Sequence, residues 1–210
     1  MDFIMQGVEF FHKGGFVMYI LLLCSIFVVA IAIERGLYFK REDSGRKFAQ
    51  HFCLLIMEKK IAEAQTLAHI TKGALAKIVE ETMLRTGETA TEIAGYMEIQ
   101  SGIVLSKLRS RLYYLNVIVT MAPLLGLLGT ISGMISAFSI FNLESGQAVA
   151  ITGGVGEALI ATAMGLCVAI IALAVHSYFI QRLEHVVTDM EQCFSVVEEE
   201  RKRGMRHETA

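Results

Sequence analysis

The sequence predicts an all-α integral membrane protein with three transmembrane helices, and two observations carry this prediction. First, 54% of the 210 residues are hydrophobic and 19% are charged, with a mean hydropathy of +0.52, which is too apolar for a soluble domain of this size. Second, Asp, Glu, Lys and Arg are absent from three blocks, residues 14–33, 112–143 and 158–181. Since about 20 apolar residues cross a bilayer core of about 30 Å as a helix, each block is long enough to span it.

The distribution of positive charge predicts the orientation. Of the 19 Lys and Arg residues, Lys13 precedes the first block, 13 lie between Arg35 and Arg111, and five lie between Arg182 and Arg206. The positive-inside rule then places the N-terminus outside and the C-terminus in the cytoplasm. The net charge of −2 gives no bulk basic character of the kind that indicates nucleic-acid binding.

These patterns divide the chain into seven segments. In order they are an outer interfacial amphipathic helix (1–13), transmembrane helix 1 (14–35), a cytoplasmic helical segment (36–111), transmembrane helix 2 (112–141), a periplasmic loop (142–153), transmembrane helix 3 (154–181) and a cytoplasmic C-terminal helix (182–210). The first segment places Phe3, Ile4, Val8 and Phe11 on one helical face, as an interfacial helix requires. A frayed terminus is the alternative for it.

Apolar residues recur with a period near 3.6 through residues 48–67 of the cytoplasmic segment and again from Leu75, with a break at residues 71–73. Thr89, followed three residues later by Glu92, has the pattern of a capping box and predicts a new helix start. From there to Asn142 the only proline is Pro123, so we expect the second span to continue a cytoplasmic helix without a break.

The third span carries a seam with alternating three- and four-residue spacing. It consists of small residues within the bilayer and of larger apolar residues beyond it: Ala158, Thr162, Gly165, Ala169, Ala172, His176, Phe179, Leu183, Val186, Met190, Cys193 and Val197. Small residues let membrane helices approach closely, and Gly126, Gly129 and Gly133 give the second span a similar stripe. Packing within the chain and contact between copies explain the seam equally well. We expect these small residues to make subunit contacts in an assembly.

Hydroxyl and ionisable groups at membrane depth are the candidate functional residues. Thr120, Thr130, Ser132 and Ser136 give the second span hydroxyls that could line a wetted path, and Thr162 adds one on the third. The alternative is that each hydroxyl bonds back to its own helix. Ser136 and His176 are candidates for a secondary pathway; for His176 an interfacial polar tip is the alternative.

Glu157 lies at the mouth of the third span, where a charge in hydrocarbon costs several kcal/mol. Two explanations remain open. It could be an acidic residue near a helix start, which is favourable by about 0.3 to 1 kcal/mol. It could instead be a partly desolvated contact for a proton or cation.

No catalytic set, phosphate loop, metal pattern or cofactor motif is visible, so we expect a protein that is not an enzyme. Cys24, Cys53, Cys167 and Cys193 match no zinc spacing and no disulfide framework. We expect all four to be small apolar fillers.

Two stretches, "APLLGLLGTISGMISAF" (122–138) and "GGVGEALIATAMGLCVAI" (153–170), resemble the paired signatures of the MotA/TolQ/ExbB proton channel family. With three spans, the chain is most similar to the ExbB/TolQ branch. The resemblance implies a homo-pentamer in the bacterial inner membrane around two helices of an ExbD/TolR-type single-span protein, whose membrane aspartate is the main proton carrier. Proton flow would drive relative rotation and work on a TonB- or TolA-like partner.

The resemblance also implies site residues. The family's span-two threonine matches Thr130, its span-three threonine matches Thr162, and its span-three acidic residue matches Glu157, which would face a wet central pore. Two family positions differ: Ile171 stands where the family usually has proline, and Ser177 where it has asparagine. The first change leaves the third span straighter, and the second removes a polar contact. A membrane scaffold that conducts no ions is the alternative function.

Overall fold

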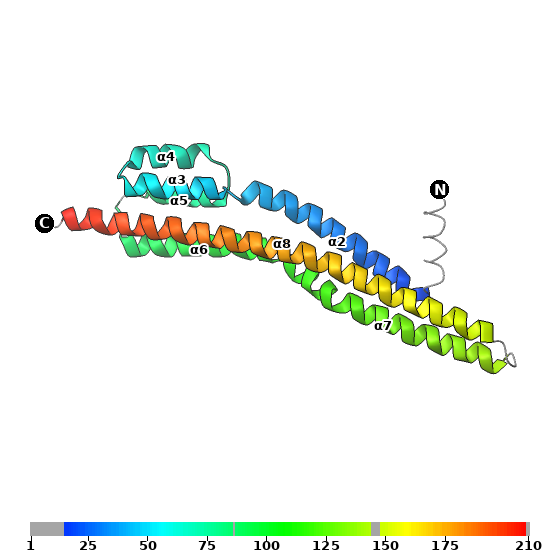
Figure 1. The fold of residues 1–210 in the computed structure, drawn as a ribbon. Helices are drawn as coiled ribbons and strands as arrows, with labels where there is room; N and C mark the ends of the chain where they lie inside the picture. Colours follow the sequence, from blue (N-terminus) through cyan, green and yellow to red (C-terminus); the bar gives the residue numbers. More distant parts are fainter. Residues whose placement is uncertain (1–14, 86, 144–147, 209–210) are drawn as a thin grey trace. The chain divides into compact units, whose positions relative to one another are not determined.

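The computed structural model describes residues 15–85, 87–143 and 148–208, without the side chains of residues 139–143, 148–152, 157 and 205–208. The described residues form helices joined by short turns, and no β-strand occurs among them (Figure 1). Three of the helical stretches are long and apolar enough to cross a membrane. The predicted all-α membrane fold with three spanning helices is therefore confirmed. The predicted interfacial helix at 1–13 lies outside the described residues.

The helices in chain order are α2 (Gly15–Glu42), α3 (Arg46–Met57), α4 (Ile61–Ile70), α5 (Ala74–Leu84), α6 (Ala90–Arg109), α7 (Leu112–Leu143) and α8 (Ala148–Glu208). They form two compact units, each described here by itself. Unit 1 comprises Met1–Ile33 and Tyr113–Ser177, and unit 2 comprises Glu34–Leu112 and Tyr178–Ala210. Helices α2 and α8 each contribute residues to both units.

Unit 1 consists of the apolar parts of α2, α7 and α8 and contains most of each predicted span (Figure 1). Helix α7 continues through Pro123. Proline is tolerated inside a membrane helix because neighbouring groups can satisfy the backbone carbonyl that loses its N–H partner. Helix α2 packs near α7, where the rings of Phe27 and Tyr114 meet edge to face with centroids 6.4 Å apart. The first part of α8 packs along α7 through small residues, which are described with the site below.

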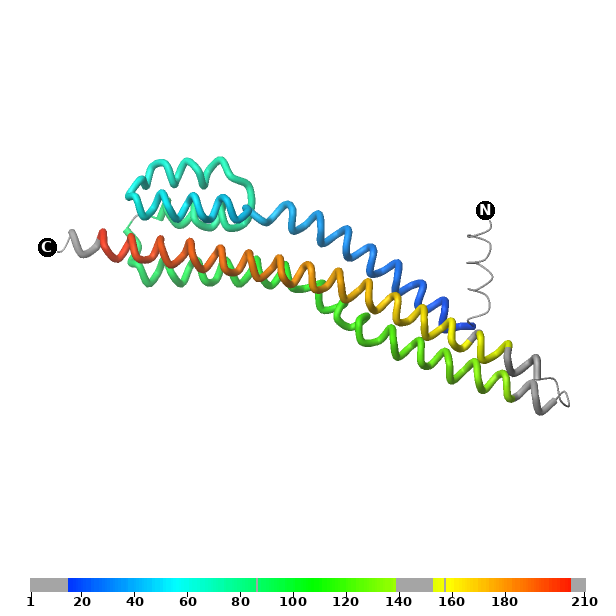
Figure 2. Tube along the Cα trace, in the orientation of Figure 1, coloured from blue at the N-terminus to red at the C-terminus, as the bar shows by residue number. Residues whose placement is uncertain are grey.

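Unit 2 is a helical bundle in which α3, α4, α5 and α6 pack against their neighbours in chain order (Figure 2). Its core contains fully buried side chains from α2, α3, α6 and α8, among them Phe39, Phe52, Met97 and Met190. The rings of Phe39 and Phe179 lie 5.3 Å apart, so α2 and α8 meet inside this unit. Burial of this apolar surface, rather than helix propensity, stabilises such short helices.

The predicted capping box at the start of α6 is confirmed. The Glu92 backbone N–H donates to the Thr89 hydroxyl, and the Thr89 backbone N–H donates to the Glu92 carboxylate at 2.7 Å. These two bonds satisfy donors that the first helical turn leaves without partners. The predicted break at residues 71–73 is also confirmed, since α4 ends at Ile70 and α5 begins at Ala74.

The expectation of an unbroken helix from the cytoplasmic segment into the second span was wrong, because residues 110–111 interrupt it. The Arg35 guanidinium, which is 4% exposed, donates to the carbonyls of Lys107 at 2.9 Å and Leu108 at 3.5 Å. In a continuous helix these carbonyls would accept from the N–H groups of Arg111 and Leu112. A side chain that occupies the hydrogen-bond ladder is a known cause of a helix interruption.

Two further boundaries differ from the sequence expectation. The periodic pattern through residues 48–67 is interrupted at residues 58–60, between the end of α3 and the start of α4. Lys59 adopts a φ of 61° in this turn. At the predicted loop 142–153, helix α7 extends to Leu143 and α8 already begins at Ala148. The stretch from Ala148 contains no proline, so nothing local prevents the helix from starting before the span. The membrane boundaries themselves stay predictions.

Candidate functional site

The closest approach between α7 and α8 in unit 1 depends on glycines. A Cβ atom added to Gly165 would lie 2.5 Å from the carbonyl oxygen of Ala122 and 3.0 Å from the Cα of Gly126. A Cβ added to Gly126 would lie 3.0 Å from the Cα of Thr162. Since the obstacles are backbone atoms, no side-chain rearrangement could relieve the overlap. The two helices therefore touch backbone to backbone at this level, as small-residue seams allow.

The rest of the seam is equally close. A Cβ added to Gly129 would lie 2.6 Å from the Cβ of Ala161, and one added to Gly133 would lie 3.1 Å from the Cβ of Ala158. The predicted packing residues Gly126, Gly129, Gly133, Ala158 and Gly165 thus face each other within one chain, and Ala169 is also buried. The structure favours packing within the chain as the role of these residues. The expectation that they also make subunit contacts stays a prediction.

The Thr162 hydroxyl crosses this interface. Its Oγ1 donates to the backbone carbonyl of Gly126 at 3.1 Å, and the side chain is half-buried. In a regular helix this carbonyl accepts only from the N–H four residues later, so it has a second lone pair available for Thr162. The structure therefore places Thr162 beside α7, where its hydroxyl is part of the contact between the two helices.

Three of the other predicted hydroxyls bond back to α7 itself. Thr130 Oγ1 donates to the Leu127 carbonyl at 2.6 Å, Ser136 Oγ to the Ser132 carbonyl at 3.0 Å, and Thr120 Oγ1 to the Val117 carbonyl at 2.9 Å. Thr130 is half-buried, whereas Ser136 and Thr120 are exposed. At 100° per residue, Thr130 and Ser136 lie at different sides of the helix, so these hydroxyls do not form the single strip expected from the sequence.

The structure describes the two ionisable candidates, Glu157 and His176, to different extents. Glu157 lies within α8 by its backbone, and its side chain lies outside the described residues. His176 is half-buried near the end of unit 1. Among the described side chains, no hydrogen bond joins His176 to Thr130 or Thr162. Among the candidate residues whose side chains are described, Thr162 is joined to the second span by a hydrogen bond between α8 and α7.

Most of the apolar surface of the three membrane helices stays uncovered in a single chain. Of their most apolar 18-residue windows, 28%, 22% and 33% is buried. Large apolar side chains such as Leu124, Ile135, Leu159 and Ile170 are exposed on α7 and α8. Surface of this kind is stable only against lipid tails or against other helices, so it fits a membrane protein that packs with further chains.

Unit 2 holds a charged cluster that sequence reasoning missed. The Arg182 guanidinium donates to the Asp43 carboxylate at 3.0 and 3.2 Å, and these groups line a cavity of about 310 Å³ with Arg46, His185 and Asp189. Asp189 is 6% exposed, and this burial raises its pKa, while nearby Arg46 opposes the shift. No spacing in the sequence could have joined residues that lie 139 positions apart.

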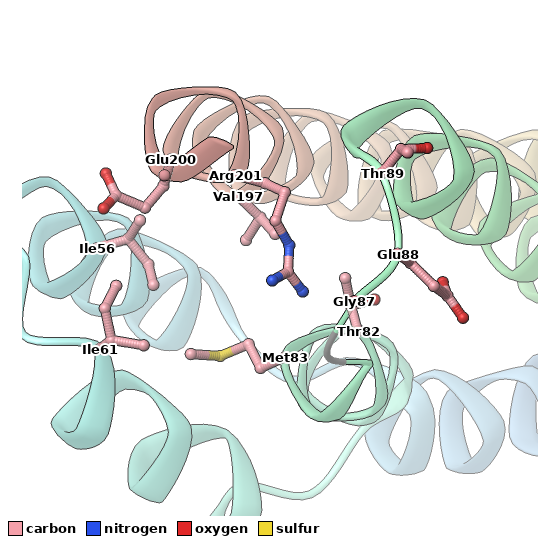
Figure 3. A pocket seen from close by; sticks show the side chains of 11 residues that line it. Ile56, Ile61, Thr82, Met83, Gly87, Glu88, Thr89, Val197, Glu200 and Arg201 are labelled. Carbon is pink, nitrogen blue, oxygen red and sulfur yellow. The ribbon is translucent and has the colours of Figure 1, made fainter. Parts of the chain in front are cut away.

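A larger open cavity of about 550 Å³ lies in unit 2 between α8 and the helices α3 to α5. Figure 3 shows the Arg201 side chain pointing into it, opposite the apolar side chains of Ile56, Ile61 and Met83. Arg201 Nη2 donates to the backbone carbonyl of Arg85 at 2.5 Å, which ties α8 to the end of α5. This hydrogen bond gives the Arg201 guanidinium a structural role in the wall of the cavity.

Comparison with known proteins gives consistent matches. Residues 62–192 match the family model described as the MotA/TolQ/ExbB proton channel family. Two ExbB-like biopolymer transport proteins of Synechocystis sp. are similar, ExbB-like 1 at 34% identity over 79% of this chain and 67% of its own, and ExbB-like 3 at 33% identity over 79% and 81%. The solved structure of C. jejuni MotAB, at 19% identity, superposes with a TM-score of 0.59 over 89% of this chain and 77% of that chain, which shows a likeness of fold.

Proposed function

The chain belongs to the MotA/TolQ/ExbB proton channel family, and on this premise we propose that it is the proton-conducting subunit of an inner-membrane motor complex. The complex would couple the proton-motive force to mechanical work on a TonB- or TolA-like envelope partner. The observation that carries the proposal is the family match over residues 62–192, because this range contains Thr130, Glu157 and Thr162 on two adjoining membrane helices. Members of this family are channel subunits rather than enzymes.

The ion pathway in this proposal uses Thr130, Glu157 and Thr162 of each copy, with Ser136 and His176 on a secondary path. Two observations support this pathway. Thr162 lies at the α7–α8 contact. Thr130, which directly follows Gly129 of the small-residue stripe on α7, is half-buried. Hydroxyls that now bond to backbone carbonyls can exchange those bonds for water where a wet path opens, since each such bond contributes only about 0.5 to 1.5 kcal/mol.

A partner protein supplies the remaining chemistry. The three apolar blocks of this chain contain no aspartate and no glutamate, and Glu157 precedes the third block. As the family resemblance implies, the main proton carrier within the membrane would be the aspartate of an ExbD/TolR-type single-span protein. We propose that five copies of this chain surround two such helices, with the exposed apolar faces of α2, α7 and α8 against lipid and neighbouring copies.

The proposed setting is the bacterial inner membrane, with the N-terminus in the periplasm and the C-terminus in the cytoplasm. The charge distribution supports this orientation, because 18 of the 19 Lys and Arg residues follow Ile33 and none lies between α7 and α8. Unit 2 would then be cytoplasmic, in agreement with its many charged surface residues and ion pairs.

Reconstitution of the complex with its single-span partner tests the role of Thr162. Thr162→Val keeps the shape of the side chain and removes the hydroxyl, whereas Thr162→Ser keeps the hydroxyl and is the matched control. We expect proton flux into vesicles to fall at least tenfold for Thr162→Val and to stay within twofold of wild type for Thr162→Ser, at equal amounts of assembled complex. Equal flux in all three proteins would remove Thr162 from the pathway.

A scaffold without ion conduction is the second candidate, because the Thr162 hydrogen bond is also compatible with a purely structural role. If the hydroxyl serves only to hold α8 against α7, Thr162→Val reduces the yield or thermal stability of the complex while flux per assembled complex is unchanged. The same reconstitution therefore separates the two functions, provided that the amount of intact complex is measured by native mass spectrometry in each sample.

A further inference from the structure

Two cysteines from distant parts of the chain meet inside unit 2. Cys53 on α3 and Cys193 on α8 are 140 residues apart in sequence, and their Sγ atoms lie 3.6 Å apart. Cys53 is 8% exposed and Cys193 is fully buried. The Cys193 thiol also lies 3.8 Å from the backbone carbonyl of Ala49, one turn before Cys53. The contact joins helices α3 and α8, which are otherwise linked covalently only through the chain between them.

The geometry of this pair is close to what a covalent bond requires. A disulfide needs its sulfurs at about 2.05 Å, so the two Sγ atoms must approach by roughly 1.5 Å. Core cysteines that serve only as fillers have apolar neighbours, and here each thiol has the other as a partner. The sequence expectation that all four cysteines are fillers took no account of this juxtaposition.

The two thiols also differ in chemical character. The hydrogen bond between the two thiols lowers the pKa of Cys53, although burial and the Asp189 carboxylate oppose this shift. The pKa of Cys193 is raised by its hydrogen bond with Cys53, by burial, and by the negative charge that a Cys53 thiolate would place beside it. Cys53 is also the less buried of the two, so we expect it to be the thiol that meets an oxidant first.

We propose that Cys53 and Cys193 form a redox modification site, in which a peroxide oxidises the two thiols to a disulfide between α3 and α8. The Cys53 thiolate attacks one peroxide oxygen, the O–O bond breaks, and the leaving hydroxide takes up a proton to become water. Cys53 is then a sulfenic acid. The Cys193 sulfur attacks the Cys53 sulfur, the S–O bond breaks, and the departing hydroxide leaves as water with the Cys193 proton. Two thiols lose two electrons and the peroxide is reduced to two waters.

Such a bond would fix α3 to α8 and prevent their separation. In a reducing compartment, disulfides between buried thiols are transient and are reversed by thiol reductants, which suits a reversible modification better than a permanent staple. The site is independent of the proposed ion pathway, because both cysteines lie in unit 2 and neither is a pathway residue.

The test uses the full chain in its membrane complex, in a Cys24→Ala, Cys167→Ala background that leaves only this pair. After treatment with hydrogen peroxide and denaturation, thiols are counted by the mobility shift that a maleimide polymer causes. We expect two labels before oxidation, none afterwards on a chain of monomer mobility, and two again after dithiothreitol. Two labels remaining after oxidation, or a disulfide between two chains, would overturn the proposal.

A second measurement avoids any substitution. In the oxidised wild-type complex, peptide mass mapping should find the Cys53 and Cys193 peptides joined, with a mass lower by two hydrogens than the two thiol peptides together. Oxidation should also raise the unfolding temperature of the wild-type chain but not of Cys193→Ser, which keeps the size of the side chain. A map that shows Cys53 only as sulfinic or sulfonic acid, with Cys193 still a thiol, would contradict the pair.

Discussion

Gly165 and Gly126 show at the scale of single residues how this chain brings two membrane helices together. In lipid there is no hydrophobic drive between helices, so the contact depends on how closely the backbones approach. The overlap that an added Cβ would cause at either glycine is with backbone atoms, which cannot move independently. The Thr162 hydrogen bond to Gly126 requires the same short distance.

Gly165→Ala should therefore separate α7 from α8. Overpacking of this kind costs about 1 to 3 kcal/mol, and here the obstacle is rigid. The expected result is a lower unfolding temperature of the purified protein and a lower yield of complex. Gly156→Ala on the same helix is the matched control, because an added Cβ there meets nothing within 4 Å. Equal stability of the two variants would contradict the close packing described here.

Asp189 leads to a pH-dependent prediction in unit 2. Burial raises its pKa, so the folded state binds this proton more tightly than the unfolded state and the ionised carboxylate destabilises the fold. The penalty is absent below the ordinary aspartate pKa of about 3.9 and grows as the pH rises through the raised pKa. Asp189→Asn should raise the unfolding temperature at pH 7, and the difference from wild type should shrink toward pH 4.

The exposed Glu191 on the same helix provides the control for this prediction, since Glu191→Gln removes a charge without a burial effect. Thermal unfolding of wild type and both variants at several pH values is the measurement. An Asp189→Asn protein that is less stable than wild type at pH 7 would mean that the carboxylate is net stabilising through Arg46.

At the scale of elements, the interruption between α6 and α7 depends on Arg35. Its guanidinium pairs with Glu34 and also donates to two carbonyls at the end of α6. Arg35→Gln removes the charge and part of this hydrogen bonding, and bonds to charged groups contribute about 1.5 to 3 kcal/mol each. We expect a loss of stability of about 2 kcal/mol or more in chemical unfolding.

Arg111→Gln is the control for Arg35→Gln. Arg111 also contacts Glu34, at 3.5 Å, but its side chain is 55% exposed, and exposed ion pairs contribute about 0 to 1 kcal/mol. If both variants lose the same stability, the carbonyl contacts of Arg35 contribute nothing, and the helix interruption needs another cause.

The helices also show which features of the fold could be predicted from the sequence and which could not. Apolar blocks, periodicity and the Thr89 capping box predicted the helices, because these signals are local. The interruption at residues 110–111 comes from Arg35, more than 70 residues away, so no local pattern carries it. The Cys53–Cys193 pair and the Asp43–Arg182 bond are missed for the same reason.

The candidate site could also be predicted from the sequence only in part. The small-residue pattern predicted which residues of α7 and α8 allow close approach, but not whether the partner helix belongs to the same chain. The hydroxyl positions were visible in the sequence, whereas their bonding to backbone carbonyls depends on side-chain rotation and on the neighbouring helix. The role of Glu157 stays a prediction.

At the scale of the whole molecule, a single chain leaves most of its membrane surface uncovered. Because the small-residue seam is used within the chain, we expect contacts between copies in the proposed ring to use the exposed larger side chains of α2, α7 and α8. This arrangement fits the proposed ring, in which each copy contributes Thr130, Glu157 and Thr162 to a shared wet axis around the partner helices. An acidic group at that depth requires such an axis, because lipid offers it no hydrogen-bond partner.

The most direct test of this account is the proton flux of a Glu157→Gln complex, reconstituted with its single-span partner in vesicles that contain a pH-sensitive dye. Gln keeps the size of the side chain and removes the charge, and native mass spectrometry confirms that equal complexes are compared. The account predicts at least a tenfold lower flux than wild type under the same imposed proton gradient. Flux equal to wild type would show that the carboxylate plays no part in conduction and would contradict the proposed pathway.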